Sequence, residues 1–253
     1  MDDTLRITLI ANAGVLLRYR GSTLLIDGIQ NSENLPFSAL PDRLWQELLC
    51  GSRRFPKIGG LLFSHLHPDH FSCPMTAQYL KRNPDLQLFI PAEPLSRKCL
   101  VDSGFRLDRT VLLFSGTEGR VFRLSPDITV QAFRTRHLDR RFYGVPHYCY
   151  LISFGSKHVL FTADIDYTSE SLSQTAGICL HAAFVNPLFF HTLSSGTRFP
   201  GKLCASHICV YHVPFAQDDQ WGTRDCLEKD RIIWDCRNGI PHTLTEPMQE
   251  LIL

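Results

Sequence analysis

The amino-acid sequence opens with three short apolar segments, at residues 5–10, 14–19 and 22–26. Turn-forming residues separate them, first Asn12-Ala13-Gly14 and then Arg20-Gly21. Apolar segments of this length between turn signals are typical of β-strands, and such short connections favour antiparallel neighbours. The pattern therefore predicts an antiparallel meander at the start of the chain.

The next part of the chain alternates between strand and helix patterns. Helical spacing of apolar residues occurs at 42–49, 75–82 and 93–101, and short apolar runs occur at 58–64, 86–90 and 110–114. Strands that alternate with helices are typical of an α/β fold with helices packed outside the sheet.

The second half is richer in strands. Two hairpins are predicted, one from 119–124 and 128–135 with its turn at 126–127, the other from 148–154 and 158–162. An apolar run at 182–190 contains Asn186-Pro187, a last clear strand lies at 208–211, and helices are predicted at 169–175 and 225–231. Residues 231–253 show no motif. A layered α/β fold of 253 residues is compatible with a single domain over 1–253.

The predicted strand at 58–64 ends in a dense group of metal-binding residue types, His65-Leu66-His67-Pro68-Asp69-His70. Imidazole nitrogen and carboxylate oxygen suit zinc, iron or manganese. One tight loop cannot bring all four side chains to one ion, so two adjacent ions are the favoured interpretation. The alternative is a polar loop that is rich in histidine without binding metal.

The spacing H-x-H-x-D-H resembles the signature of the metallo-β-lactamase-fold metallohydrolases. The closest resemblance is to the branch with phosphorylated-sugar lactonases and small metal-dependent hydrolases. It implies a four-layered αββα sandwich, and a cofactor of two divalent metal ions, with zinc expected and iron or manganese as alternatives. It also implies hydrolysis by a metal-bridging hydroxide.

Carried over by position, the resemblance implies a complete ligand set. One ion would take His65, His67 and His137, the other would take Asp69, His70 and His212, and Asp164 would bridge them. Asp69 and Asp164 would be the catalytic residues. Asp27 would support the metal loop without binding metal, although it could equally be a simple Asp-Gly turn. Ala163 departs from the family, which usually has glycine at that position.

These ligand candidates share a place in the predicted fold. His65, His137, Asp164 and His212 each follow the carboxyl end of an apolar strand, the edge where α/β folds build sites. His207 precedes the strand that His212 follows. Because a strand rises about 3.3 Å per residue, only one of the two can reach the site. We expect His212 to be the ligand and His207 to be solvated at the opposite edge.

Charge is informative only locally. The net charge of +1 gives no overall attraction to nucleic acid or to an anionic membrane, so neither partner is expected. Four arginines surround His137, at 134, 136, 140 and 141. Guanidinium groups bind phosphate and carboxylate, which favours a small anionic substrate. A solvated strand end partly neutralised by Asp139 is the alternative. Arg136, His147 and His191 are the candidate substrate contacts.

The sequence favours a metal-dependent hydrolase of a small, anionic ester or lactone. A phosphodiesterase or nuclease of the same fold, a di-iron redox protein with the same ligands, and a binding protein with an inert site are the alternatives. Nucleases of this fold usually add an RNA-clamping insertion or a basic arm, for which length and charge leave no room. The sequence lacks a signal-peptide pattern and a long apolar span, so a cytoplasmic location is expected. Nine cysteines without a C-x-x-C pair predict free thiols.

Overall fold

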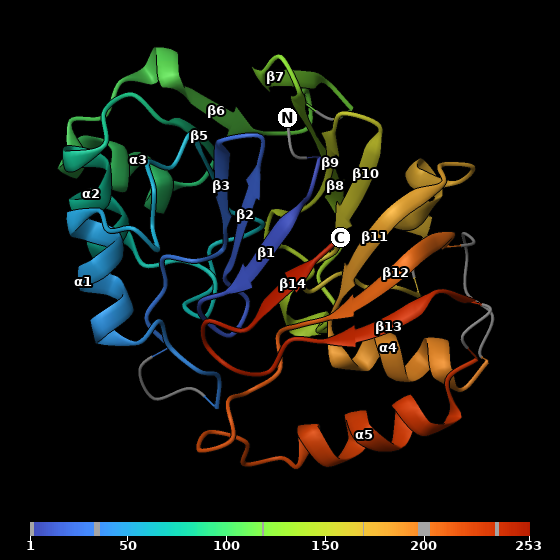
Figure 1. Cartoon of the computed structure of the whole chain (residues 1–253). Helices are drawn as coiled ribbons and strands as arrows, with labels where there is room; N and C mark the ends of the chain where they lie inside the picture. Colours follow the sequence, from blue (N-terminus) through green and yellow to red (C-terminus); the bar gives the residue numbers. More distant parts are fainter. Residues whose placement is uncertain (1–2, 33–35, 118, 169, 197–202, 236–237) are drawn as a thin grey trace. The chain divides into compact units, whose positions relative to one another are not determined.

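The computed structural model describes residues 3–32, 36–117, 119–168, 170–196, 203–235 and 238–253. The chain forms two compact units, one of Met1–Thr117 with Glu246–Leu253 and one of Glu118–Thr245. Each unit contains one mixed β-sheet with its own helices (Figure 1). The α/β class predicted from the sequence is thus confirmed, and the single domain over 1–253 stays a prediction.

The sheet of the first unit has the strand order β14-β1-β2-β3-β4-β5-β6. Its strands are β1 (Arg6–Leu9), β2 (Val15–Tyr19), β3 (Ser22–Ile26), β4 (Gly60–Leu62), β5 (Gln87–Pro91), β6 (Thr110–Leu113) and β14 (Glu250–Ile252). The first three strands form the predicted antiparallel meander, and β3 to β6 run parallel. Consequently the carboxyl ends of β3 and β4 lie at the same edge, in the register Ile26 to Leu62.

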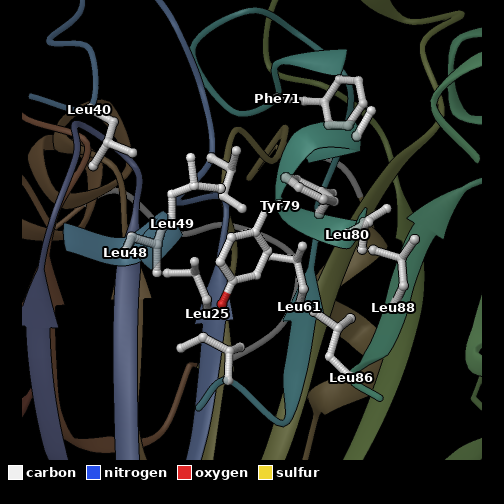
Figure 2. Packing of buried hydrophobic residues seen from close by; sticks show 14 of the residues in the cluster. Leu25, Leu40, Leu48, Leu49, Leu61, Phe71, Tyr79, Leu80, Leu86 and Leu88 are labelled. Carbon is white, nitrogen blue, oxygen red and sulfur yellow. The ribbon is translucent and has the colours of Figure 1, made fainter. Parts of the chain in front are cut away.

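The helices of this unit are α1 (Asp42–Cys50), α2 (Cys73–Arg82) and α3 (Pro94–Ser103), with a 3-10 turn η1 (Leu107–Arg109) before β6. The apolar faces of α1 and α2 pack on the sheet, as Figure 2 shows. There Leu48 and Leu49 of α1 and Tyr79 and Leu80 of α2 join Leu25, Leu61 and Leu88 of the strands in one cluster. Burying a leucine side chain stabilises a fold by about 2 kcal/mol, so the leucines of this cluster stabilise the packing of the helices on the sheet.

The second unit has the strand order β13-β12-β11-β10-β9-β8-β7. The strands are β7 (Val121–Ser125), β8 (Ile128–Thr135), β9 (His147–Phe154), β10 (Lys157–Phe161), β11 (Leu180–Val185), β12 (Ala205–Val210) and β13 (Ile240–Thr243). Strands β7 to β10 are antiparallel neighbours, as the two predicted hairpins require, and β10 to β13 are parallel. Because β8, β10 and β12 therefore run in one direction, their carboxyl ends share an edge of this sheet.

The apolar run predicted at 182–190 is two elements. Strand β11 ends at Val185 and helix α4 (Pro187–Ser194) follows, because the Asn186 side chain caps the helix by accepting the Phe189 N–H at 2.9 Å. Helix α5 (Thr223–Ile233) follows β12, and Phe190 of α4 packs on Trp234 at its end, with ring centroids 4.9 Å apart.

Several short elements differ from the sequence predictions. Strands β13 and β14 lie in the tail where the sequence showed no motif, and the 3-10 turn η2 (Arg140–Phe142) was not predicted. The helix predicted at 169–175 is the 3-10 helix η3 (Glu170–Thr175), and residue 169 lies outside the described residues. Residues 33–35, which lie between β3 and α1 in the sequence, and 236–237 of the tail also lie outside them. No helix in the described part of the chain has the length and apolarity needed to cross a membrane.

Candidate metal centre

Asp27 stands at the end of β3 and anchors the loop that follows β4. Its backbone is in the left-handed region, at φ 48°, and its N–H donates to the Leu62 carbonyl at 3.0 Å. The Asp27 carboxylate accepts the Ser64 N–H at 2.8 Å through Oδ1 and the Ser64 hydroxyl at 2.6 Å through Oδ2. Gly28 keeps this turn tight, since a Cβ there would lie 2.4 Å from Leu25 Cδ1. The predicted supporting role of Asp27 therefore has a direct structural basis.

Asp27 also orients His70. His70 Nδ1 lies 2.9 Å from Asp27 Oδ2, and both side chains are fully buried. A carboxylate only accepts hydrogen bonds, so the proton of a neutral His70 ring sits on Nδ1 and the lone pair on Nε2. That Nε2 atom lies 3.6 Å from Asp69 Oδ2. A carboxylate behind a histidine is the arrangement that fixes metal-binding imidazoles in proteins.

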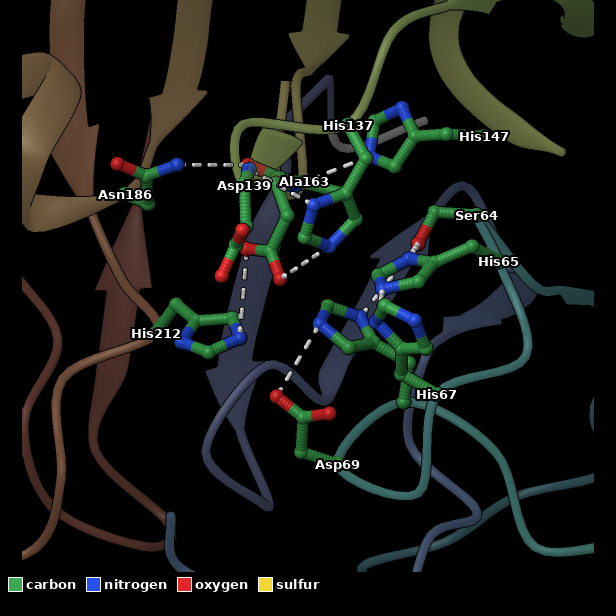
Figure 3. Close-up of polar contacts among 12 residues, drawn as sticks. Ser64, His65, His67, Asp69, His137, Asp139, His147, Ala163, Asn186 and His212 are labelled. Carbon is green, nitrogen blue, oxygen red and sulfur yellow. Dashed lines mark hydrogen bonds and ion pairs between the residues drawn. The ribbon is translucent and has the colours of Figure 1, made fainter. Parts of the chain in front are cut away.

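His65 and His67 approach each other through the nitrogens that could bind one ion (Figure 3). His65 Nε2 lies 3.1 Å from His67 Nδ1, while His65 Nδ1 lies 3.0 Å from the Ser64 hydroxyl. Two nitrogens bound tetrahedrally to one zinc, each about 2.05 Å from it, would be about 3.3 Å apart. The observed spacing therefore fits a shared ion.

The loop closes where α2 begins. His70 and Phe71 both donate their N–H to the His67 carbonyl, at 3.0 and 2.9 Å. The Ser72 N–H then donates to Ile29 at 2.9 Å, which returns the chain to the sheet. The loop is thus fixed at its start by a side chain and at its end by backbone.

Asp164 is the centre of the ligand group in the second unit. It follows β10, and its two carboxylate oxygens face different imidazoles, with Oδ2 3.6 Å from His137 Nε2 and Oδ1 3.5 Å from His212 Nε2. Two atoms 3.5–3.6 Å apart that are each about 2.05 Å from one ion subtend about 115–125° at it. Each oxygen can therefore share an ion with its own histidine, which is the geometry of a bridging carboxylate.

The backbone before Asp164 is unusual. Ala163 has φ 46°, in the left-handed region that costs an L-residue about 1 kcal/mol, which explains why glycine is common at this position in the resembling family. The Ala163 N–H donates to the Tyr211 hydroxyl at 3.1 Å, and its carbonyl accepts the Asn186 side-chain amide at 3.1 Å. His212 is also left-handed, at φ 60°.

His147, predicted from the sequence as a substrate contact, has a different environment. It is fully buried, its Nε2 accepts the Asp164 N–H at 3.1 Å, and its Nδ1 lies 2.6 Å from the Thr135 hydroxyl. Since Nε2 accepts, the neutral ring carries its proton on Nδ1 and donates it to Thr135. With both ring nitrogens bonded to protein, His147 holds the backbone of Asp164, and its contact with a substrate stays a prediction.

His137 lies between a turn and an aromatic ring. Its Nδ1 accepts the Asp139 N–H at 3.0 Å, and its ring meets the edge of Phe142 with centroids 5.3 Å apart. This contact uses the Nδ1 lone pair, so a metal at Nε2 would replace the ring proton or turn the ring away from Asp139. Asp139 is itself held by Arg141, whose hydrogen bonds lower the pKa of that carboxyl to about 2.

Arg136, the second predicted substrate contact, is already paired. Its Nε donates to Asp166 Oδ2 at 2.7 Å, and its guanidinium lies 4.4 Å from the centre of the Tyr143 ring. Burial alone would raise the pKa of Asp166, but hydrogen bonds from Thr168 and Arg136 hold it below its usual value. Among the residues that the structure describes, Arg134 and Arg140 are the exposed arginines of this group that form no ion pair.

Two further histidines lie in structural contacts. His191, the third predicted substrate contact, is on α4, where its Nδ1 lies 2.9 Å from Asp230 of α5. His207 lies within β12, half-buried and not solvated as expected, because its Nδ1 lies 2.9 Å from His242 Nε2 on β13. The structure therefore brings His212, and not His207, to Asp164.

Sequence reasoning missed four supporting residues, namely Ser64, Thr135, Asn186 and Tyr211. Only Asn186 carried a local signal, because Asn-Pro inside an apolar run is a typical helix start. Ser64, Thr135 and Tyr211 act through their hydroxyl groups, whose partners lie 12 or more residues away in the sequence. No local sequence pattern encodes such contacts.

No family model matches this sequence, and no curated protein matches it. Solved structures do match. The metallo-β-lactamase fold protein YhfI from Bacillus subtilis has 17% sequence identity and a TM-score of 0.64, over 99% of this chain and 100% of that one. Igni18, a metallo hydrolase from Ignicoccus hospitalis KIN4/I, has 13% identity and a TM-score of 0.63, over 99% and 98%. CmlA, a diiron β-hydroxylase from Streptomyces venezuelae, has 17% identity and a TM-score of 0.63, over 100% of this chain and 54% of that one. At these identities the likeness establishes the fold.

Proposed function

We propose that this chain, which has the metallo-β-lactamase fold, is a metal-dependent hydrolase with two divalent metal ions, expected to be zinc, that acts on a small anionic ester or lactone. The observation that carries the proposal is Asp164, whose two oxygens face two different imidazoles. A carboxylate placed in this way is suited to reach two ions at once. A lone ion pair would need only one of these contacts.

The donor set fits metal ions in both units. In the first unit the His65 and His67 nitrogens are spaced for one ion, and Asp27 leaves the His70 lone pair on Nε2. In the second unit the Asp164 oxygens are paired with His137 and His212. In this proposal one ion takes His65, His67 and His137, the other takes Asp69, His70 and His212, and Asp164 bridges.

The ions, when bound, would lower the pKa of a water molecule and polarise the carbonyl of an ester. The residues of the chain orient the candidate ligands and shield them from solvent. Asp27 holds the proton on His70 Nδ1, His147 holds the Asp164 backbone, and burial of His65 and His70 keeps bulk water from competing for their nitrogens. Asp69, nearly buried, is placed to accept a proton during hydrolysis.

The anionic preference rests on the arginines near His137. Because Arg136 is neutralised by Asp166, the charge available to a substrate belongs to Arg134 and Arg140. Arg140 is the one on the turn whose Phe142 contacts His137. Arg140→Ala should therefore raise the KM for anionic esters well above its effect on neutral ones, with Arg136→Ala as the matched control. Equal effects of Arg140→Ala on both substrates would remove the anionic part of the proposal.

The test of the whole proposal is metal content with hydrolytic activity. Elemental analysis should find two transition-metal ions per chain, and a panel of phosphorylated lactones, phosphodiesters and thioesters should reveal activity that a chelator abolishes. Asp164→Ala should lose metal and activity together, because two cations would then face each other without the shared carboxylate. Asp85→Ala, which removes an exposed carboxylate paired with Lys57, should change neither. Activity that survives complete metal removal would refute the proposal.

A redox function is the second candidate, because the diiron β-hydroxylase CmlA shares the fold over the whole of this chain. The same nitrogen and carboxylate donors accept iron. Iron in the purified protein, with an absorption spectrum that changes on reduction and no activity on the ester panel, would favour this candidate over the hydrolase.

A further inference from the structure

The backbone corner at Ala163 and Asp164 carries an inference that rests on the proposed function. We propose that His147, Asn186 and Tyr211 are positioning residues that hold this corner and so aim the two oxygens of Asp164. Their hydrogen bonds keep Ala163 in the left-handed conformation, which a glycine at this position would adopt without strain. None of the three is a metal ligand in the proposed set.

The contacts leave little freedom at the corner. The Ala163 N–H is bound by Tyr211 at 3.1 Å and the Ala163 carbonyl by Asn186 at 3.1 Å. The Asp164 N–H is bound by His147 at 3.1 Å, and the Asp164 carbonyl accepts the Leu138 N–H at 2.7 Å. Every backbone polar group of the two residues therefore has a partner, and three of the four partners arise from different strands or strand ends.

Each positioning residue is in turn fixed by its surroundings. Thr135 bonds the far nitrogen of His147, and the Phe189 N–H occupies the Asn186 carbonyl oxygen. The Tyr211 ring is fully buried and forms a T-shaped contact with the Phe184 ring, with centroids 5.6 Å apart. A side chain held on both sides loses no further entropy when it binds the corner, so its hydrogen bond can act fully on the backbone.

The corner controls the carboxylate because its dihedral angles set the direction of the Asp164 side chain. If Ala163 relaxed from φ 46° toward the ordinary negative region, the oxygens would leave their positions 3.5 and 3.6 Å from His212 and His137. A glycine would occupy the left-handed region without strain. The clamp should therefore matter with alanine at 163 and matter much less with glycine.

The experiment is a double-mutant cycle on the full chain with Co²⁺ as the probe. Tyr211→Phe and Asn186→Ser are made with Ala163 and again with Ala163→Gly, and Co²⁺ affinity is measured for each bound ion by absorption. Serine keeps the cap of α4 while removing the amide that binds Ala163, which separates the two roles of Asn186. Tyr150→Phe, at a buried tyrosine of β9, is the matched control.

With alanine at 163, each variant should weaken the affinity for at least one ion about 2- to 12-fold, the range of one hydrogen bond. With Ala163→Gly the same variants should change it less than about 2-fold. His147→Gln should weaken it in both backgrounds, because its partner is the amide of Asp164 itself. In the metal-free protein, loss of the Tyr211 contact should speed amide hydrogen exchange at residue 163, and loss of the His147 contact should speed it at residue 164.

The outcomes separate the two proposals. Equal losses from Tyr211→Phe or Asn186→Ser in both backgrounds, or losses of thermal stability with unchanged Co²⁺ affinity for any of the three variants, would overturn the positioning role and leave the proposed function standing. A wild-type chain that binds no Co²⁺ would refute the proposed function, and the positioning role of the clamp with it. Affinity losses that glycine suppresses would support both.

Discussion

Replacing Asp27 by asparagine should move the proton on His70 and weaken metal binding. Asparagine tolerates the left-handed backbone at this position, so the change acts on the side chain alone. Its carbonyl can still accept the Ser64 N–H, but its NH₂ group takes the place of the Oδ2 atom that faces His70. His70 Nδ1 must then accept, which transfers the ring proton to Nε2, the nitrogen proposed to bind metal.

The size of the effect follows from the bonds. Asp27 accepts three hydrogen bonds in a fully buried site, and a bond to a charged group contributes about 1 kcal/mol more than a neutral one. Asp27→Asn should therefore lower the free energy of unfolding of the metal-free protein by about 2–3 kcal/mol. Residues that orient metal-bound histidines typically change metal affinity 10- to 100-fold, and we expect a loss in that range.

Urea denaturation, Co²⁺ titration and nitrogen NMR of the His70 ring would measure the three effects. Ser64→Ala is the control, because it removes one bond to Asp27 and keeps the contact between Asp27 and His70. It should lower stability without moving the ring proton. An Asp27→Asn protein that keeps its proton on Nδ1, or binds metal within about twofold of wild type, would refute the reasoning.

Three further predictions follow from other contacts. His212→Ala should deplete one metal ion and reduce turnover by orders of magnitude, while His207→Ala should change neither, and elemental analysis with kinetics would show a reversal of this order. Burial lowers the pKa of His207 and His242, and Lys157 lowers that of His207 further, so the unfolded chain binds more protons and stability should fall as the pH drops below about 6.5. His207→Gln should flatten this pH dependence in thermal melts, and an unchanged slope would contradict it. Arg136→Ala should lower the melting temperature, because it leaves the nearly buried carboxylate that it pairs with unneutralised, and a melting temperature equal to wild type would contradict that role.

The sequence determined those features that depend on local spacing. Short apolar runs between turn signals predicted the meander of β1 to β3 and the two hairpins of the second unit, and the structure contains them. The cluster from His65 to His70 could be identified from the sequence because its candidate ligands lie within six residues. The rule that sites lie beyond strand ends also located His137, Asp164 and His212 correctly at one edge of their sheet.

Elements whose formation depends on residues far away in the sequence could not be predicted from the sequence. Strand β14 is three residues long and exists because it pairs with β1 across the length of the chain. His207 and His242 meet only because β12 and β13 are neighbours, so the expectation of a solvated His207 was wrong. In both cases the deciding interaction lies between residues that no window of sequence contains together.

The same reason explains why two predicted substrate contacts, Arg136 and His147, have protein partners in the structure. Arg136 and His147 have the residue types of substrate contacts, and only the tertiary structure decides that Asp166 neutralises one and that the Asp164 amide occupies the other. A side chain's chemistry is set by the sequence, but its availability is set by the partner it has already bound. That partner is chosen by the packing of strands that are far apart in the chain.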